Sequence, residues 1–183
     1  VTLDPKIIWN THIENITNKA NSTLGFIRRN VLTTSQTVKE TAYKQLVRPV
    51  LEYASVAWDS VTETQAKRLE SVQRRAARLI CGIRKTDRKT STTSLLQQLN
   101  LPPLSQRRGE RRLKVFSQYH HNNPSVLAKY ITRSAHNSAR RHQHQYFTPQ
   151  TNTTHCRRSF FIRTAREWNM LPDTSHLLSP QCV

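Results

Sequence analysis

The chain has 183 residues, of which 29 are Lys or Arg and 11 are Asp or Glu, so its formal net charge is +18. This length suffices for one core or for two small helical bundles. A positive charge of this size predicts strong attraction to polyanions, above all DNA or RNA. No signal peptide and no membrane-spanning apolar run is visible, so we expect an intracellular protein, nuclear or cytoplasmic, and not a secreted one.

A polybasic protein of the membrane surface is the competing interpretation of the charge. Such proteins combine their charge with a lipid anchor or an interfacial helix. The sequence has neither a myristoylation pattern nor a prenylation box, since Cys182 is next to last. Together with Cys81 and Cys156 it makes an odd number of cysteines at irregular spacing, which disfavours a disulfide framework. We therefore expect no membrane partner.

The composition favours helices. Glycine occurs 3 times and proline 8 times, and neither a sustained alternating pattern nor an Asn-Gly or Asp-Gly turn is present. The fold class that we expect is all-α, a small helical bundle with a basic, partly disordered C-terminal region. In order, we expect an extended lead-in (1–9), a helical domain (10–84), a second helical segment (85–132), a flexible basic linker (133–157), and a C-terminal helical motif with a tail (158–183).

Two helical patterns precede residue 60. The first has apolar residues at three- and four-residue steps: Ile13, Ile16, Ala20, Leu24, Ile27 and Val31. Arg28 and Arg29 in its last turn complement the helix dipole and need no other explanation. The second is predicted to begin with a capping box of Thr37 and Glu40, and Pro49 should kink or restart it. Tyr53 and Trp58 then follow, which we interpret as core anchors rather than base-stacking platforms.

The third pattern is the most two-sided helix of the chain. A capping box of Thr62 and Gln65 begins it, and Gly82 provides a left-handed stop. At about 100° per residue one arc is apolar: Leu69, Val72, Ala76, Leu79, Ile80 and Ile83. The opposite arc is cationic: Lys67, Arg68, Arg74, Arg75 and Arg78. Glu63 and Glu70 lie toward one edge, so we predict that this arc faces nucleic acid rather than solvent alone.

The next segment repeats the cationic pattern. After a charged loop, a short helix begins at about Ser94 and ends before Pro102 and Pro103. Residues 104–119 form another helical pattern with a single acid, Glu110, on its polar face. Its candidate nucleic-acid contacts are Arg107, Arg108, Arg111 and Arg112.

Residues 134–154 are mostly polar and cannot bury enough surface to offset their ordering entropy. We therefore predict a flexible linker that binds polyanions. Order should resume in residues 158–172, where Phe160, Phe161, Trp168 and Leu171 can dock.

We expect no metal, no cofactor and no catalysis by this chain alone. The histidines and the cysteine of the polar segment match no common zinc spacing: His136, His142, His144, His155 and Cys156. No nucleophile elbow and no Walker glycine loop is present. Two-metal phosphoryl transfer needs clustered carboxylates, whereas the aspartates are scattered singly: Asp4, Asp59, Asp87 and Asp173.

Several stretches resemble one family. LGFIRRN (24–30), VKETAYKQLVRPVLEYASVAWD (38–59) and LESVQRRAARLI (69–80) resemble the C-terminal part of non-LTR (LINE-type) retrotransposon reverse transcriptases of animals, in particular the jockey and CR1-like group. The opening VTLDPKIIWNTHI is similar to the segment that leaves the polymerase palm. SFFIRTAREWNMLP (159–172) is similar to a motif near the end of those reading frames. The resemblance covers most of the chain in the expected order and weakens at 134–154.

The resemblance implies that residues 1–9 are the end of a palm segment and that residues 10–84 form a thumb-like domain. In such polymerases the thumb grips the template–primer duplex by its backbone. The match carries over to cations of two motifs: Arg74, Arg75 and Arg78 in QRRAAR, and Lys39, Lys44 and Arg48 in VKETAYKQLVRP. Their contact with phosphate is our inference from their chemistry.

The chain also departs from the family. The catalytic Tyr/Phe-x-Asp-Asp motif, the endonuclease domain and the Cys/His knuckle of some related elements are absent, as are the prolines that often flank Trp58 or occupy the place of Ile162. Our leading hypothesis is a fragment of an RNA-directed DNA polymerase that binds RNA–DNA or DNA duplex through phosphates, largely independently of sequence. The alternatives are a helical scaffold for an acidic protein, a non-functional relic of a transposable element, and a fragment that needs the missing palm in order to fold.

Overall fold

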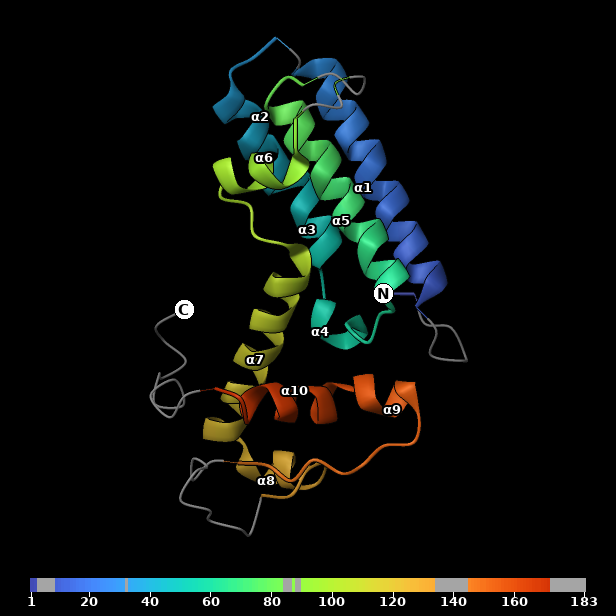
Figure 1. Ribbon diagram of the computed structural model, residues 1–183, viewed down its shortest axis with the longest axis vertical. Coiled ribbons are helices and arrows are strands. Elements are labelled where there is room, and N and C mark those ends of the chain that lie inside the picture. Colours follow the sequence, from blue (N-terminus) through green and yellow to red (C-terminus); the bar gives the residue numbers. More distant parts are fainter. Residues whose placement is uncertain (3–8, 32, 84–86, 88–89, 134–144, 172–183) are drawn as a thin grey trace. The chain divides into compact units, whose positions relative to one another are not determined.

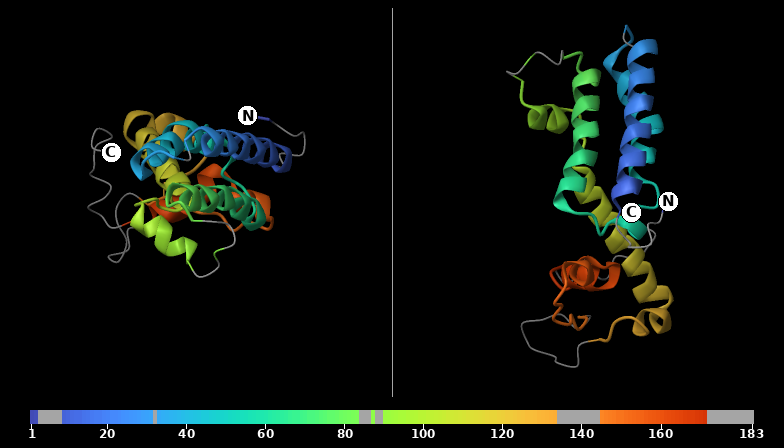
Figure 2. Two further views of the ribbon diagram at one scale, coloured as in Figure 1. Left: turned by 90° about the horizontal axis from the view of Figure 1, so that it is seen from above. Right: turned by 90° about the vertical axis from the view of Figure 1, so that its right-hand side faces the viewer.

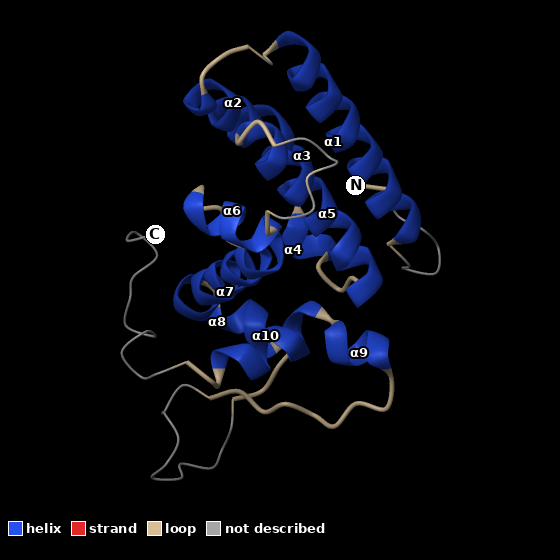
Figure 3. Ribbon diagram, turned by 45° about the horizontal axis from the view of Figure 1, so that its top comes forward, coloured by secondary structure: helices blue, strands red, loops and turns tan. Residues whose placement is uncertain are grey.

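The computed structural model describes residues 1–2, 9–31, 33–83, 87, 90–133 and 145–171. All regular secondary structure in these ranges is helical, apart from one isolated bridge between Arg133 and Tyr146 (Figures 1 and 3). The prediction of an all-α fold is therefore confirmed. The chain divides into two compact units, Val1–Arg108 (unit 1) and Gly109–Val183 (unit 2).

Unit 1 holds most of the helices. They are α1 (Asn10–Asn30), α2 (Gln36–Ala42), the π-helical turn η1 (Tyr43–Val47), α3 (Arg48–Glu52), α4 (Ser55–Trp58), α5 (Glu63–Ile80), α6 (Thr92–Gln98) and the first turn of α7 (Leu104–Asn122). Unit 2 holds the rest of α7, α8 (Pro124–Ala128), α9 (Thr154–Arg158) and α10 (Phe160–Trp168). The first unit extends beyond the predicted boundary at residue 84, because Leu95 and Leu99 of α6 are buried in the same core as α5.

Helices α1 and α5 lie side by side and run in the same direction (Figures 1 and 2). Two hydrogen bonds set their register: Gln65 Nε2 donates to Asn10 Oδ1 (2.6 Å), and Arg75 Nη1 donates to Asn21 Oδ1 (2.9 Å). Most residues of their predicted apolar arcs are buried: Ile13, Ala20, Leu24, Ile27, Leu69, Val72, Ala76 and Ile80. The other four, Ile16, Val31, Leu79 and Ile83, are partly buried against the same core. One side of α5 is thereby committed to the core, and its opposite side is left for solvent or a ligand.

Both ends of α5 form as predicted. Thr62 Oγ1 accepts from the Gln65 backbone N–H (3.3 Å), and Gln65 Oε1 accepts from the Thr62 N–H (2.7 Å), which completes the capping box. At the other end Gly82 has φ +69°, where a side chain would be strained. The N–H groups of Gly82 and Ile83 then donate to Leu79 O (3.2 Å) and Arg78 O (2.9 Å), a Schellman motif.

The cap of α5 gives a first testable prediction. Thr62→Ala should lower the free energy of unfolding of unit 1 by about 1 kcal/mol, because it leaves the Gln65 N–H without its side-chain acceptor. Urea unfolding followed by far-UV circular dichroism measures the change. Thr64→Ala, at an exposed position of the same helix, is the matched control and should change little. Equal losses in the two variants would contradict the role of the cap.

The segment α2–η1–α3 departs from the prediction at its start. Helix α2 begins after Ser35, whose Oγ accepts from the Val38 N–H (3.4 Å), so the predicted capping box of Thr37 and Glu40 is wrong. Glu40 instead pairs with Lys44 (2.6 Å), one turn further on. The predicted restart at Pro49 is confirmed, because η1 ends at Val47 and Pro49 lies in the first turn of α3.

Of the two predicted aromatic anchors, one is correct. Trp58 is fully buried, and its indole N–H donates to Tyr53 O (2.9 Å). Tyr53 itself is 73% exposed, so its assignment to the core is wrong. Ala54, which follows it, has φ +50°, and this left-handed residue separates α3 from α4 and turns the two neighbouring aromatic residues to different environments.

Unit 2 has its own small core. It consists of Phe116, Leu127, Ile131, Tyr146, Ala165 and Trp168. Tyr146 comes from the predicted linker, yet its hydroxyl bonds to His120 Nδ1 (2.6 Å) and its backbone exchanges two hydrogen bonds with the Asn169 side chain. The linker prediction for residues 133–157 is thus corrected at Tyr146 and at α9. Residues 134–144, the lead-in residues 3–8 and the tail 172–183 lie outside the described residues.

Candidate nucleic-acid interface

The outer side of α5 is the strongest concentration of cations that the sequence predicts in unit 1. We call Lys67, Arg68, Arg74, Arg75 and Arg78 the α5 basic face. The first four are exposed and Arg78 is half-buried. They lie opposite the buried residues Leu69, Val72 and Ala76 because the helix places residues about 100° apart around its axis. The two-sided arrangement predicted for this helix is therefore present.

Most of these cations keep their charge uncompensated. Lys67 pairs with Glu63 (2.7 Å), an exposed contact within the helix. Arg75 and Arg78 donate to neutral groups, the Asn21 side chain (2.9 Å) and Asp87 O (3.0 Å). Across the described part of the chain, no carboxylate forms an ion pair with the arginines of the face.

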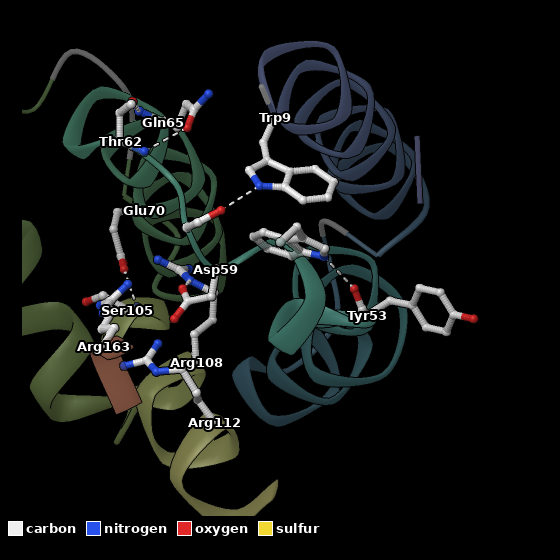
Figure 4. A network of polar contacts seen from close by, with 12 residues as sticks. Trp9, Tyr53, Asp59, Thr62, Gln65, Glu70, Ser105, Arg108, Arg112 and Arg163 are labelled. Atoms are coloured by element: carbon white, nitrogen blue, oxygen red, sulfur yellow. Dashed lines mark hydrogen bonds and ion pairs between the residues drawn. The ribbon is translucent and has the colours of Figure 1, made fainter. Parts of the chain in front are cut away.

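Three carboxylates of unit 1 are bound by the start of α7: Glu52, Asp59 and Glu70 (Figure 4). Glu70 Oε1 accepts from the Ser105 backbone N–H (2.9 Å), at the positive end of the helix dipole. Asp59 Oδ1 accepts from Arg108 Nε (2.8 Å). Glu52 binds Arg107 through both of its oxygens, one of them at 3.1 Å from Nη2.

These contacts also explain the charge of the α5 basic face. Glu70 lies on the same helix as the basic face and could otherwise reduce its potential. Because Glu70 is held by the first turn of α7, it stays at the edge of the helix. Sequence reasoning placed Glu70 at that edge and could not identify its partner, which is 35 residues away.

Helix α1 adds two arginines that sequence reasoning did not select. Arg28 and Arg29 are exposed in its last turn. Because α1 and α5 are parallel and Asn21 lies opposite Arg75, this turn reaches the same end of unit 1 as the last turn of α5 (Figure 1), which contains Arg78. The motif LGFIRRN contains both arginines, but only the register between the two helices shows that they lie at that end.

Two predicted contacts are corrected by burial. The side chains of Arg108 and Arg112 are each 2% exposed, and they pair with Asp59 and Glu167. Burial lowers the pKa of Arg112, while the hydrogen bond to Glu167 acts in the opposite direction. These arginines hold the fold together and cannot reach a phosphate. The sequence suggested otherwise because their partners are 49 and 55 residues away, far beyond helical spacing.

The other predicted contacts are dispersed. Lys39 is buried in α2, Lys44 pairs with Glu40, and Arg48 is half-buried at the start of α3. Arg107 is mostly buried and bound to Glu52, whereas Arg111 is exposed on the part of α7 that belongs to unit 2. The structure therefore does not gather the twelve predicted residues into one surface. The α5 basic face is the part that remains continuous.

Metal and membrane features can be assessed in the described residues alone. They contain no group of three or more His, Cys, Asp or Glu residues close enough to hold a metal ion. His155 and Cys156 are exposed on α9, and the other histidines weighed as ligands, His136, His142 and His144, lie outside the described residues. Among the described helices, none combines the length and the hydrophobicity that a membrane crossing requires.

Comparison with known proteins provides no counterpart for this arrangement. No protein-family model matches the chain, and neither a curated protein nor a solved structure similar to it is found.

Proposed function

We propose that this chain is a non-catalytic, nucleic-acid-binding helical domain derived from the thumb and post-thumb region of a LINE-type reverse transcriptase. It holds an RNA–DNA or DNA duplex through phosphate contacts. The α5 basic face carries the proposal, because its arginines are directed away from the core and have no carboxylate partner among the described residues. The resemblance of residues 24–80 to such polymerases supports the origin.

The dimensions of the face suit a phosphate backbone. From Arg68 to Arg78 the helix rises by roughly 15 Å, which corresponds to about four phosphates of one strand. Guanidinium groups bind phosphate oxygens in a bidentate manner, which favours arginine over lysine at such contacts. Phosphate contacts position a protein on a duplex without reading its bases. We therefore expect binding with little sequence specificity and a strong dependence on salt.

The salt dependence of duplex binding tests this proposal. Replacing both Arg68 and Arg74 with Gln should reduce the magnitude of the slope of log K against log salt by about 2, because each phosphate contact contributes about 0.9 to the slope. Fluorescence anisotropy of a labelled duplex across a salt series measures the slope. Arg75 and Arg78 are left intact because they also bond to the Asn21 side chain and to Asp87 O.

A pair of single variants controls for net charge. Arg74→Gln and Lys19→Gln each remove one exposed positive charge, but Lys19 lies on α1 and outside the α5 basic face. Arg74→Gln should reduce the magnitude of the slope by about 1, and Lys19→Gln should leave the slope nearly unchanged. If the two variants change the slope equally, duplex binding depends on the overall charge of the chain and not on the α5 basic face. If duplex fails to displace an acidic protein bound to this face, the scaffold alternative is favoured.

A further inference from the structure

Two aromatic rings stack on each other at the surface of unit 2. Tyr130 follows α8, and Phe161 lies in the first turn of α10; their centroids are 4.5 Å apart and their planes differ by 8°. Phe160 contacts Phe161 edge to face, with ring centroids 5.0 Å apart, and this contact helps to hold the Phe161 ring in place. Tyr130 is 63% exposed although it is stacked on one side. The face of Tyr130 that is turned away from Phe161 is therefore open to solvent.

A third exposed aromatic side chain lies on a neighbouring segment. The backbone N–H of Phe147 donates to Thr132 O (2.9 Å), and the isolated bridge between Arg133 and Tyr146 pairs the same two segments. Phe147 is 57% exposed. Since Tyr146 turns inward to the core of unit 2, its neighbour Phe147 turns outward beside the segment that carries Tyr130. Exposed rings are thus concentrated in this part of the unit.

Among the described residues, the charged side chains nearest to the rings in the sequence are cations. The cations close in the chain to the stacked pair are Lys129, Arg133, Arg157, Arg158 and Arg163, of which Arg158 and Arg163 are half-buried and the others exposed. The acids among the described residues of unit 2 are Glu110 and Glu167. Glu167 is bound by Arg112 and by Arg163 (3.2 Å). A ligand for this surface should therefore combine flat apolar faces with negative charge.

We propose that Tyr130 and Phe161 form a stacking site for single-stranded nucleic acid. A base stacks on the open face of Tyr130, and Lys129, Arg133 and Arg157 attract the flanking phosphates. Aromatic rings combined with a positive groove are the common means of binding single strands without sequence preference. A duplex fits less well, because its bases are already stacked on one another. This site lies in unit 2, is independent of the α5 basic face, and goes beyond the function proposed above.

Binding of a fluorescein-labelled oligothymidylate to the full chain tests the site. Tyr130→Ala should weaken binding by about tenfold, the typical effect of removing a stacking ring, while Tyr130→Trp should preserve it. Tyr53→Ala is the matched control, because Tyr53 is the comparably exposed tyrosine of unit 1, and it should leave the affinity unchanged. Circular dichroism confirms that the variants are folded. Equal affinities of Tyr130→Ala and the unaltered chain would overturn the proposal.

A second measurement separates stacking from charge. An abasic oligonucleotide of the same length should bind the unaltered chain about tenfold more weakly than oligothymidylate, and Tyr130→Ala should remove this difference. Equal binding of the two oligonucleotides by the unaltered chain would show that phosphates alone are recognised, which contradicts the stacking site. The Arg74→Gln variant should retain single-strand binding to unit 2. A failure of the α5 proposal and a failure of this one are therefore distinguishable.

Discussion

Asp59→Ala should lower the free energy of unfolding of unit 1 by about 3–5 kcal/mol, the largest effect that we expect from a single substitution. The side chains of Asp59 and Arg108 are 5% and 2% exposed, and Oδ1 and Nε are 2.8 Å apart. The Arg108 guanidinium also lies 5.9 Å from the centroid of the buried Trp58 ring. Removing the carboxylate leaves a desolvated positive charge beside an indole ring. Urea unfolding followed by tryptophan fluorescence measures the loss.

A double variant shows whether the loss of stability comes from breaking the Asp59–Arg108 ion pair or from removing the Asp59 side chain itself. Arg108→Met in the Asp59→Ala background should recover part of the stability, because the buried guanidinium that lost the Asp59 carboxylate is then replaced by an apolar side chain. Glu63→Ala, which breaks the exposed pair with Lys67, is the control and should leave the unfolding midpoint nearly unchanged. Simple additivity of Asp59→Ala and Arg108→Met would contradict the coupling between the two side chains.

The elements of this fold that sequence predicts well depend on short-range signals. Helix α5 has its capping box, its apolar arc and its glycine stop within about 20 residues, a length over which helical periodicity is a dependable signal. The cap of α2 shows the limit of the same reasoning. Ser35 and Thr37 are both good cap residues two positions apart, and the choice between them depends on how the loop after α1 enters the helix.

Residues whose environment is set by distant partners could not be predicted in this way. Arg108 and Arg112 have the pattern of a solvated helix face, and only the fold brings Asp59 and Glu167 to them. Tyr146 lies in a polar stretch that offers no periodic signal, yet it fills the core of unit 2. The α5 basic face was predictable as a row of cations. Its lack of carboxylate partners depends on contacts made by the first turn of α7.

Gln73→Met should lower the free energy of unfolding of unit 1 by about 2–4 kcal/mol, because it leaves the buried Tyr43 hydroxyl without its acceptor and the half-buried Pro102 carbonyl without this donor. Gln73 is 1% exposed; its Oε1 accepts from the Tyr43 hydroxyl (3.0 Å), and its Nε2 donates to Pro102 O (2.9 Å). Burial raises the pKa of Tyr43, so the hydroxyl stays protonated and requires an acceptor. Methionine matches the volume of glutamine but provides no hydrogen-bonding replacement.

The companion variant Tyr43→Phe tests whether this bond is the cause. Alone it should cost about 1 kcal/mol, but in the Gln73→Met background it should cost nothing or restore stability, because it removes the hydroxyl that the first substitution left unpaired. Gln97→Met, at an exposed position of α6, controls for the chemical change and should be nearly neutral. A loss in Gln97→Met equal to that in Gln73→Met would show that burial is not the reason. Gln73 lies on the side of α5 away from its arginines, where its side chain links α5 to Tyr43 of η1 and to Pro102 before α7. These bonds hold that side of α5 against the core of unit 1, and so help to direct the α5 basic face outward.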